Sequence, residues 1–136
     1  MISHIEKIRV RYGETDQMGY VYYGNYALYY EVGRVELLRK IGVAYSDLEK
    51  QGIGLPVSYF EIKYLKPVRY DDIIQVKTTI SEIPQSRITF NYECTNDSNI
   101  VLNTGKVTLV FINIKTGKPI GCPKNLQLLF NSYLVE

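Results

Sequence analysis

Apolar and charged positions alternate over residues 7–12, so that Ile8, Val10 and Tyr12 share one face and basic side chains share the other. This period of two predicts a half-buried strand. After a loop with two glycines the period changes, and apolar positions recur at helical spacing from Gly24 to Lys40. They predict a helix of about four and a half turns. Because its first half is almost free of charge, we expect much of the helix to be enclosed.

The remainder of the chain is mainly strand. A short surface helix over 45–51 is expected to end before Gly52, and the tail from Pro123 predicts one or two helical turns. The last strand is expected to be apolar on both faces, as suits a central strand or one that meets a second subunit. In all, alternation and turn residues predict four strands in this part, over residues 57–65, 73–83, 87–95 and 100–114.

The order of these elements predicts the fold class. One strand, a long apolar helix and four strands joined mainly by short turns indicate an α+β protein with an antiparallel sheet. We expect a single domain over residues 1–136, in which a curved five-stranded sheet covers one side of the helix. The other face of the sheet is expected to carry Tyr and aliphatic side chains, which predicts a dimer or larger assembly.

Composition and charge exclude several function classes. No apolar run approaches the ~18 residues of a membrane span, and charges occupy the place of a signal peptide's apolar block, so we expect a cytoplasmic protein. The net charge of +2 gives no reason to expect a nucleic-acid partner. His4, the one histidine, stands near an end that we expect to fray, which disfavours a Ser-His-Asp triad. Cys94 and Cys122 lack the spacing of a zinc site. An enzyme of this composition would rely on carboxylates and backbone amides.

The loop before the long helix holds the candidate chemistry. Asp16 lies between a strand end and a helix start, and Gly19 and Gly24 let a ligand approach the backbone closely. Unpaired N–H groups around Tyr23 at the helix start favour a developing oxyanion. A carboxylate beside them is the minimum set for acyl hydrolysis. Such an Asp is also a common turn or cap residue, while Asn25 is the better-placed cap or else a polar group of a pocket.

The segment from Tyr12 to Tyr26, YGETDQMGYVYYGNY, resembles the signature of hotdog-fold acyl-CoA thioesterases. Similar groups are the 4-hydroxybenzoyl-CoA thioesterase type and the Tol-Pal-cluster acyl-CoA thioesterases. In the helix that follows, residues 31–34 (EVGR) resemble the family's E/D-x-x-R, and residues 64–72 resemble the stretch between its second and third strands. The order of elements agrees from residue 5 to about residue 123.

This resemblance implies a hotdog fold, with a five-stranded antiparallel sheet wrapped around one long central helix. Asp16 takes the position of the family's catalytic aspartate, and Tyr23 the position whose backbone N–H polarises the thioester carbonyl. Subunits of the family pair edge to edge into dimers and often form tetramers, in which a neighbouring subunit lines the pocket. Substrate-binding residues are therefore expected at Gly24, Asn25, Leu55, Pro56, Val57 and Ser58.

The function implied is hydrolysis of an acyl-CoA thioester to a free acid and coenzyme A, without a metal or any cofactor beyond the coenzyme A of the substrate. Asp16 would act as nucleophile or general base. The alternative is a non-catalytic acyl or aromatic ligand-binding module on the same fold; a hotdog dehydratase would need a His–acid pair, with only His4 available. Glu31 is expected to pair with Arg34 rather than face the pocket. Cations that could hold the coenzyme A phosphates are Lys66, Arg69, Arg87, Lys118 and Lys124.

Overall fold

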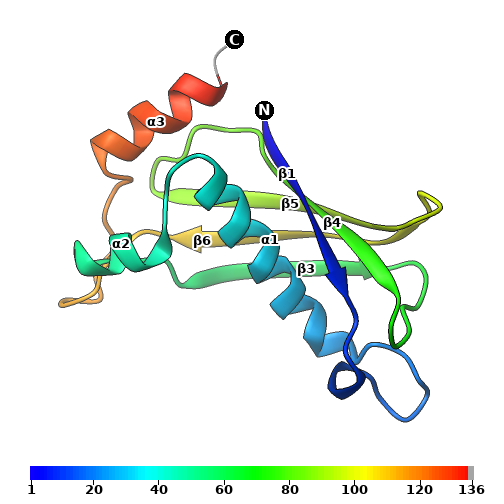
Figure 1. Ribbon diagram of the computed structural model, residues 1–136. Helices are drawn as coiled ribbons and strands as arrows, with labels where there is room; N and C mark the ends of the chain where they lie inside the picture. Colours follow the sequence, from blue (N-terminus) through cyan, green and yellow to red (C-terminus); the bar gives the residue numbers. More distant parts are fainter. Residues whose placement is uncertain (135–136) are drawn as a thin grey trace.

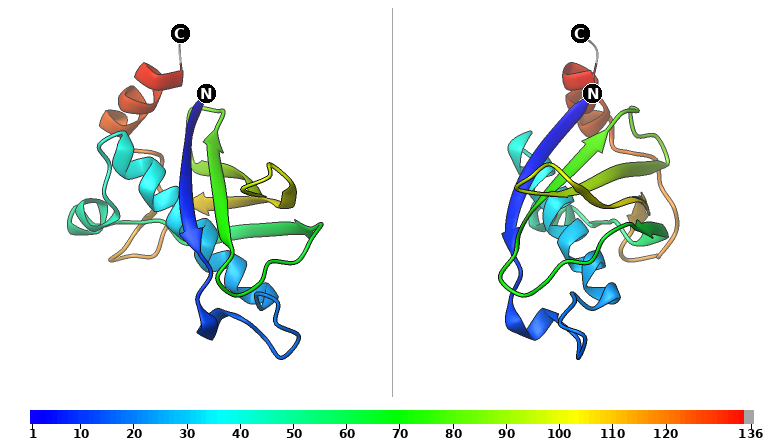
Figure 2. Two further views of the ribbon diagram at one scale, coloured as in Figure 1. Left: turned by 45° about the vertical axis from the view of Figure 1, so that its right-hand side comes forward. Right: turned by 90° about the vertical axis from the view of Figure 1, so that its right-hand side faces the viewer.

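One long helix lies across a twisted antiparallel sheet in the computed structural model, which describes residues 1–134 (Figures 1 and 2). The helix is α1 (Tyr26–Lys40), and the strand order in the sheet is β1-β4-β5-β6-β3 with every neighbouring pair antiparallel. The α+β class and the five-stranded sheet around one helix are therefore confirmed. The strands are β1 (Ile2–Arg9), β3 (Val57–Tyr64), β4 (Ile73–Ile80), β5 (Arg87–Asn96) and β6 (Val101–Val110).

Shorter elements connect these parts. Two of them form a separate two-stranded sheet, and two 3-10 turns flank the loop that precedes α1. The predicted surface helix is present and ends close to the expected Gly52. These elements are η1 (Tyr12–Glu14), η2 (Tyr23–Asn25), α2 (Tyr45–Lys50), β2 (Ile53–Gly54) and β7 (Ile112–Asn113).

The tail forms α3 (Lys124–Leu134), which is longer than the one or two turns predicted. The helix extends because Leu126 and Phe130, one turn apart on the same face, are both buried. Figure 2 shows α3 at the end of the molecule where β1 begins, away from the loop that precedes α1. Within residues 1–134, no helix combines the length and hydropathy that a membrane crossing requires.

The inner face of the sheet packs against α1 as the alternation predicts. A Cβ atom at Gly33 of α1 would overlap the hydroxyl of Thr78 in β4. The mid-helix glycine therefore allows α1 to lie close to side chains of β4. The buried positions of β4 and β5 are Ile74, Val76, Thr78, Ile80, Ile88, Phe90, Tyr92 and Cys94.

The first strand does not span residues 7–12 as predicted. β1 begins at Ile2, which is buried, and ends at Arg9. His4 is consequently paired with Thr78 in the ladder between β1 and β4 and does not lie at a frayed end. Residues 2–6 were not predicted as strand because they do not alternate cleanly: Ile5 lies on the outer face, is apolar and is 52% exposed.

The outer face of the sheet is polar, so the apolar face predicted there is wrong. The residues of β5 that alternate with its buried positions include Thr89, Asn91 and Glu93. In β6, Lys106 is exposed and Thr108 shares a 3.0 Å hydrogen bond with Thr89. The expected strand over 100–114 is also divided between β6 and β7.

Exposed apolar surface gathers instead on β3, which forms one edge of the sheet. Four of its side chains are at least 39% exposed: Val57, Tyr59, Phe60 and Tyr64. An edge strand with unpaired backbone groups and exposed aromatic side chains is a ready surface for pairing with another chain. The structural reason to expect an assembly therefore lies at the edge of the sheet and not on its outer face.

Candidate active site

Asp16 organises the loop between η1 and η2. Its Oδ1 atom accepts hydrogen bonds from the backbone N–H groups of Met18 (2.9 Å) and Tyr20 (3.2 Å). Its own N–H donates to the Tyr20 carbonyl at 2.8 Å, and Gly19 closes the turn with a φ of +80°. Asp16 is thus a turn residue, but this role uses one carboxylate oxygen only. Over residues 1–134, the structure records no hydrogen bond to Oδ2.

The loop is fastened to the rest of the chain at its far end. The Val21 N–H donates to the carbonyl of Val68 at 2.7 Å. Tyr20 forms an isolated β-bridge with Arg69, and the guanidinium carbon of Arg69 lies 4.7 Å from the centre of the Tyr20 ring. A cation over a tyrosine ring adds a modest electrostatic attraction. These contacts bring the Asp16 turn against the segment that leaves β3.

The turn η2 presents free backbone donors next to this loop. Asn25 N–H donates to the Tyr22 carbonyl and Tyr26 N–H to the Tyr23 carbonyl, so the 3-10 turn is closed. The N–H groups of Tyr23 and Gly24 precede those bonds and find no acceptor in the described part of the chain. Because η2 continues directly into α1, these two N–H groups lie at the positive end of the helix dipole.

A cavity of about 300 Å³ brings Asp16 and Tyr23 together. The Tyr64 hydroxyl at the end of β3 donates to the Tyr23 carbonyl at 3.2 Å and closes one side of it. The cavity therefore joins a carboxylate, a helix start and an apolar wall, which is the combination that acyl hydrolysis needs. Its lining comprises Asp16, Met18, Tyr20, Val21, Tyr23, Tyr26, Tyr64, Leu65, Lys66 and Pro67.

Two predicted neighbours of Tyr23 lie outside this lining. Gly24 is covered by the ring of Tyr22, which a Cβ atom at residue 24 would meet at 2.9 Å. Asn25 stands at the N-cap position of α1, as predicted, but its side chain makes no capping hydrogen bond. The reason is that η2 precedes the helix; the Asn25 Nδ2 instead donates to the Glu14 carbonyl at 2.8 Å.

The expected Glu31–Arg34 ion pair is also wrong. Arg34 is 6% exposed, and its Nε donates to the Tyr45 hydroxyl at 3.2 Å. Glu31 points to solvent on the neighbouring face of α1. The i,i+3 spacing permits a pair, but packing of α2 against Arg34 draws the guanidinium into the protein.

The segment from Leu55 to Ser58 lies apart from Asp16 within one chain. Leu55 and Pro56 line a separate groove of about 290 Å³ together with residues of α2 and β2. Val57 is 50% exposed on β3, and the Ser58 hydroxyl donates to the Thr108 carbonyl at 3.2 Å. These four residues could therefore line the cavity beside Asp16 only in a neighbouring subunit, and not in their own chain.

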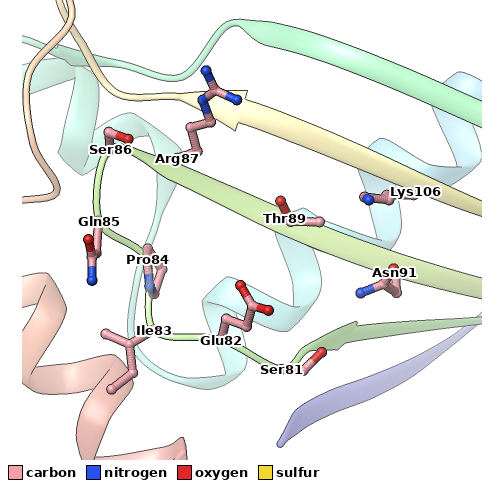
Figure 3. A pocket seen from close by; sticks show the side chains of 10 residues that line it. All are labelled: Ser81, Glu82, Ile83, Pro84, Gln85, Ser86, Arg87, Thr89, Asn91 and Lys106. Atoms are coloured by element: carbon pink, nitrogen blue, oxygen red, sulfur yellow. The ribbon is translucent and has the colours of Figure 1, made fainter.

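A second cavity, of about 520 Å³ and larger than the one beside Asp16, occupies the outer face of the sheet. Figure 3 shows its side chains projecting from β5, β6 and the loop between β4 and β5, with α1 behind the sheet. Its charged side chains are Arg87, Lys106 and Glu82. Of the cations predicted for coenzyme A, Arg87 thus lies on this face, whereas Lys66 lines the Asp16 cavity.

Glu14 is a residue of this site that the sequence analysis missed. Its carboxylate accepts hydrogen bonds from Arg11 and Tyr29, and its carbonyl accepts them from Tyr22 and Asn25 at the start and end of η2. The only sequence signal was the spacing of Arg11 and Glu14, three residues apart, which here lets the Arg11 guanidinium donate two hydrogen bonds to Oε2 of Glu14.

The sequence matches a known family over most of its length. The model of the thioesterase-like superfamily matches residues 10–130. The acyl-CoA thioester hydrolase YbgC of Escherichia coli O6:H1 is 29% identical over 123 residues, which cover 90% of this chain and 92% of YbgC.

Solved structures share the fold. A DHNA-CoA thioesterase from Staphylococcus aureus superimposes with a TM-score of 0.93 at 35% sequence identity, covering 98% of this chain and 91% of that one. A 4-hydroxybenzoyl CoA thioesterase complexed with 4-hydroxybenzoyl CoA gives a TM-score of 0.83 at 19% identity, over 95% of this chain and 99% of that one. The second likeness concerns the fold alone. Together they match the hotdog fold expected from the sequence.

Proposed function

The chain belongs to the thioesterase-like superfamily and is an acyl-CoA thioesterase, and we propose that Asp16 and the Tyr23 N–H perform its hydrolysis. The observation that carries this assignment is the single cavity lined by both residues. One oxygen of Asp16 is held by the turn, so the carboxylate is fixed while the other oxygen stays available for chemistry.

The reaction requires the thioester carbonyl oxygen to face the N–H groups of η2. As the carbonyl carbon becomes tetrahedral, its oxygen gains negative charge, which these donors and the helix dipole stabilise. In the general-base route, Asp16 takes a proton from the attacking water. The C–S bond then breaks, and the proton passes from Asp16 to the departing thiolate of coenzyme A.

In the nucleophilic route, an Asp16 oxygen attacks the carbonyl carbon and expels the thiolate, which gives a mixed anhydride that water then hydrolyses. Both routes start from an ionised Asp16 and use the same oxyanion donors. Incorporation of ¹⁸O into Asp16 during single-turnover hydrolysis in H₂¹⁸O identifies the nucleophilic route, because only water attack on the Asp16 carbonyl of the anhydride can place the label there. Neither route uses a cofactor, so we propose that coenzyme A enters as part of the substrate alone.

We expect the wild-type chain to release free thiol from at least one acyl-CoA with kcat/KM of about 10⁴ M⁻¹s⁻¹ or more, the low end of ordinary enzymes. A thiol-detecting reagent and a panel of short, branched, long and aromatic acyl-CoA thioesters provide the test. The aromatic members matter because the S. aureus relative is named a DHNA-CoA thioesterase. Binding of acyl-CoA without release of thiol across the panel would favour the ligand-binding alternative.

We further propose that the working protein is at least a dimer, joined through the edge strand β3. This edge exposes unpaired backbone and apolar side chains, and the next strand inward, β6, is already paired on both sides. Pairing there would bring Leu55, Pro56, Val57 and Ser58 of one subunit toward the Asp16 cavity of its neighbour. A tetramer and a cytoplasmic location stay predictions.

Replacing Phe60 with Lys should convert the assembly into monomers and lower activity about tenfold, since like-charged side chains would meet across the joined edges. Phe60 is 39% exposed on β3. Ile5→Lys, on the opposite edge strand β1, is the matched control because Ile5 is 52% exposed and its replacement should leave the mass unchanged. Sedimentation and thiol release measure the two effects; a fully active wild-type monomer would contradict the shared site.

A further inference from the structure

We propose that Glu14 is a positioning residue for hydrolysis, because it locks the start of η2, and with it the Tyr23 N–H, to the loop that carries Asp16. The inference rests on the function proposed above. Glu14 does not line the cavity, so it acts through its neighbours and not on the substrate.

The carboxylate of Glu14 is fully engaged. Oε1 accepts hydrogen bonds from the Arg11 backbone N–H (2.8 Å) and from the Tyr29 hydroxyl (2.9 Å). Oε2 accepts two more from the Arg11 guanidinium, from Nε at 3.1 Å and from Nη2 at 2.7 Å. Tyr29 belongs to α1 and is 2% exposed. One side chain therefore joins the end of β1, the turn η1 and the body of the central helix.

The carbonyl of Glu14 holds the other side of the site. It accepts the Tyr22 N–H at 2.9 Å and the Asn25 Nδ2 at 2.8 Å. These two residues flank Tyr23 and Gly24, whose N–H groups are the free donors of η2. The loop that contains Asp16 begins after Glu14 and ends at Tyr22, which is bonded to the Glu14 carbonyl. The two ends of the loop cannot separate without breaking these bonds.

The charge of Glu14 is suited to this role and not to proton transfer. Burial of the carboxylate opposes its ionised form, but the hydrogen bonds from Arg11 and Tyr29 outweigh burial and lower the pKa of Glu14. Its side chain is 12% exposed. Glu14 therefore stays ionised and holds four donors, whereas Asp16 keeps an oxygen free.

Positioning matters because an oxyanion donor acts over a narrow distance. Donors must lie about 2.7–3.1 Å from the developing charge, and a misplacement of 1 Å can lower a rate by about 10²-fold. Loosening Glu14 should therefore affect the transition state more than the binding of the substrate. The expected signature is a fall in kcat with little change in KM.

The test is Glu14→Gln, whose amide N–H₂ would oppose the donors of Arg11. We expect kcat to fall roughly 10- to 30-fold, below the ~10²-fold loss for a full 1 Å displacement. KM should stay within about twofold, and the circular dichroism spectrum should stay native. Amide exchange of Tyr22 should accelerate at least about tenfold, because its N–H bond to the Glu14 carbonyl is the reporter of the lock.

Three further variants sharpen the result. Glu14→Asp keeps the negative charge and should recover part of the lost kcat. Tyr29→Phe removes one of the four donors and should lower kcat only about threefold, as suits one hydrogen bond. The matched control is Asp71→Asn, which breaks the 3.1 Å ion pair between Asp71 and Arg9. Asp71 has a φ of 71°, which Asn also tolerates. This variant should leave kcat unchanged.

If the Glu14→Gln variant kept the wild-type kcat and the wild-type amide exchange of Tyr22, the positioning role of Glu14 would be wrong. The proposed thioesterase function would be unaffected by that result. A loss that followed the unfolded fraction, or one confined to KM, would also overturn the positioning role, because it would indicate a purely structural or binding role. A wild-type chain that hydrolysed none of the acyl-CoA panel would overturn both the proposed function and this inference.

Discussion

Asp16→Asn is expected to lower kcat for thioester hydrolysis by about 10³-fold, within the range of roughly 10²–10⁴ for general acid–base catalysis. The Asn oxygen can accept the same N–H groups, from Met18 and Tyr20, that Oδ1 accepts now. The turn should therefore persist, along with the fold and the assembly. The amide nitrogen takes the place of Oδ2, and it can neither attack a carbonyl nor accept a proton at neutral pH. Thiol release measures kcat, and thermal melting checks the fold.

The matched control for this experiment is Asp72→Asn. Asp72 also accepts a backbone N–H within a loop, from Arg69 at 2.9 Å, but it does not line the Asp16 cavity. Its replacement should leave kcat within about twofold of the wild type, as expected for an exposed surface change. If Asp16→Asn retained half of the wild-type kcat, Asp16 would have neither the nucleophilic nor the general-base role.

The parts of the fold that depend on local pattern could be predicted from the sequence. In β4 and β5 every second residue is buried, and all of these residues except Thr78 are apolar. Asp16 and Tyr23 could be assigned to one site because a short loop closed by Gly19 connects them. Short separations along the chain leave little conformational freedom, so local pattern determines proximity there.

The parts that depend on distant contacts could not be predicted in the same way. The wall of the cavity formed by Tyr64 comes from a strand end far from Asp16 in sequence. The role of Glu14 depends on Tyr29, fifteen positions away, reaching back from the helix. The outer face of the sheet was misread because β6 has apolar residues at consecutive positions, so its alternation did not show that Lys106 faces outward.

Tyr23→Pro is expected to lower kcat at least about 100-fold, since loss of one oxyanion donor typically costs roughly 10²–10³ in kcat. Proline removes the N–H of residue 23, which donates to no acceptor within residues 1–134, so no internal hydrogen bond is lost. Tyr22 has a ψ of 131°, the extended conformation that a residue before proline adopts, and proline is well tolerated in a first helical turn. The circular dichroism spectrum should therefore stay native.

The matched controls keep the N–H and change only the side chain of residue 23. Tyr23→Phe removes the hydroxyl, and Tyr23→Ala also removes the ring that lies 4.7 Å from that of Tyr22. Because the Tyr23 side chain is 64% exposed, we expect kcat of both variants to fall no more than about tenfold, roughly 1.4 kcal/mol. The Tyr64 hydroxyl donates to the carbonyl of residue 23, a bond that all three variants should keep. Equal losses in the Phe and Pro variants would identify the phenol, and not the backbone N–H, as the group that stabilises the transition state.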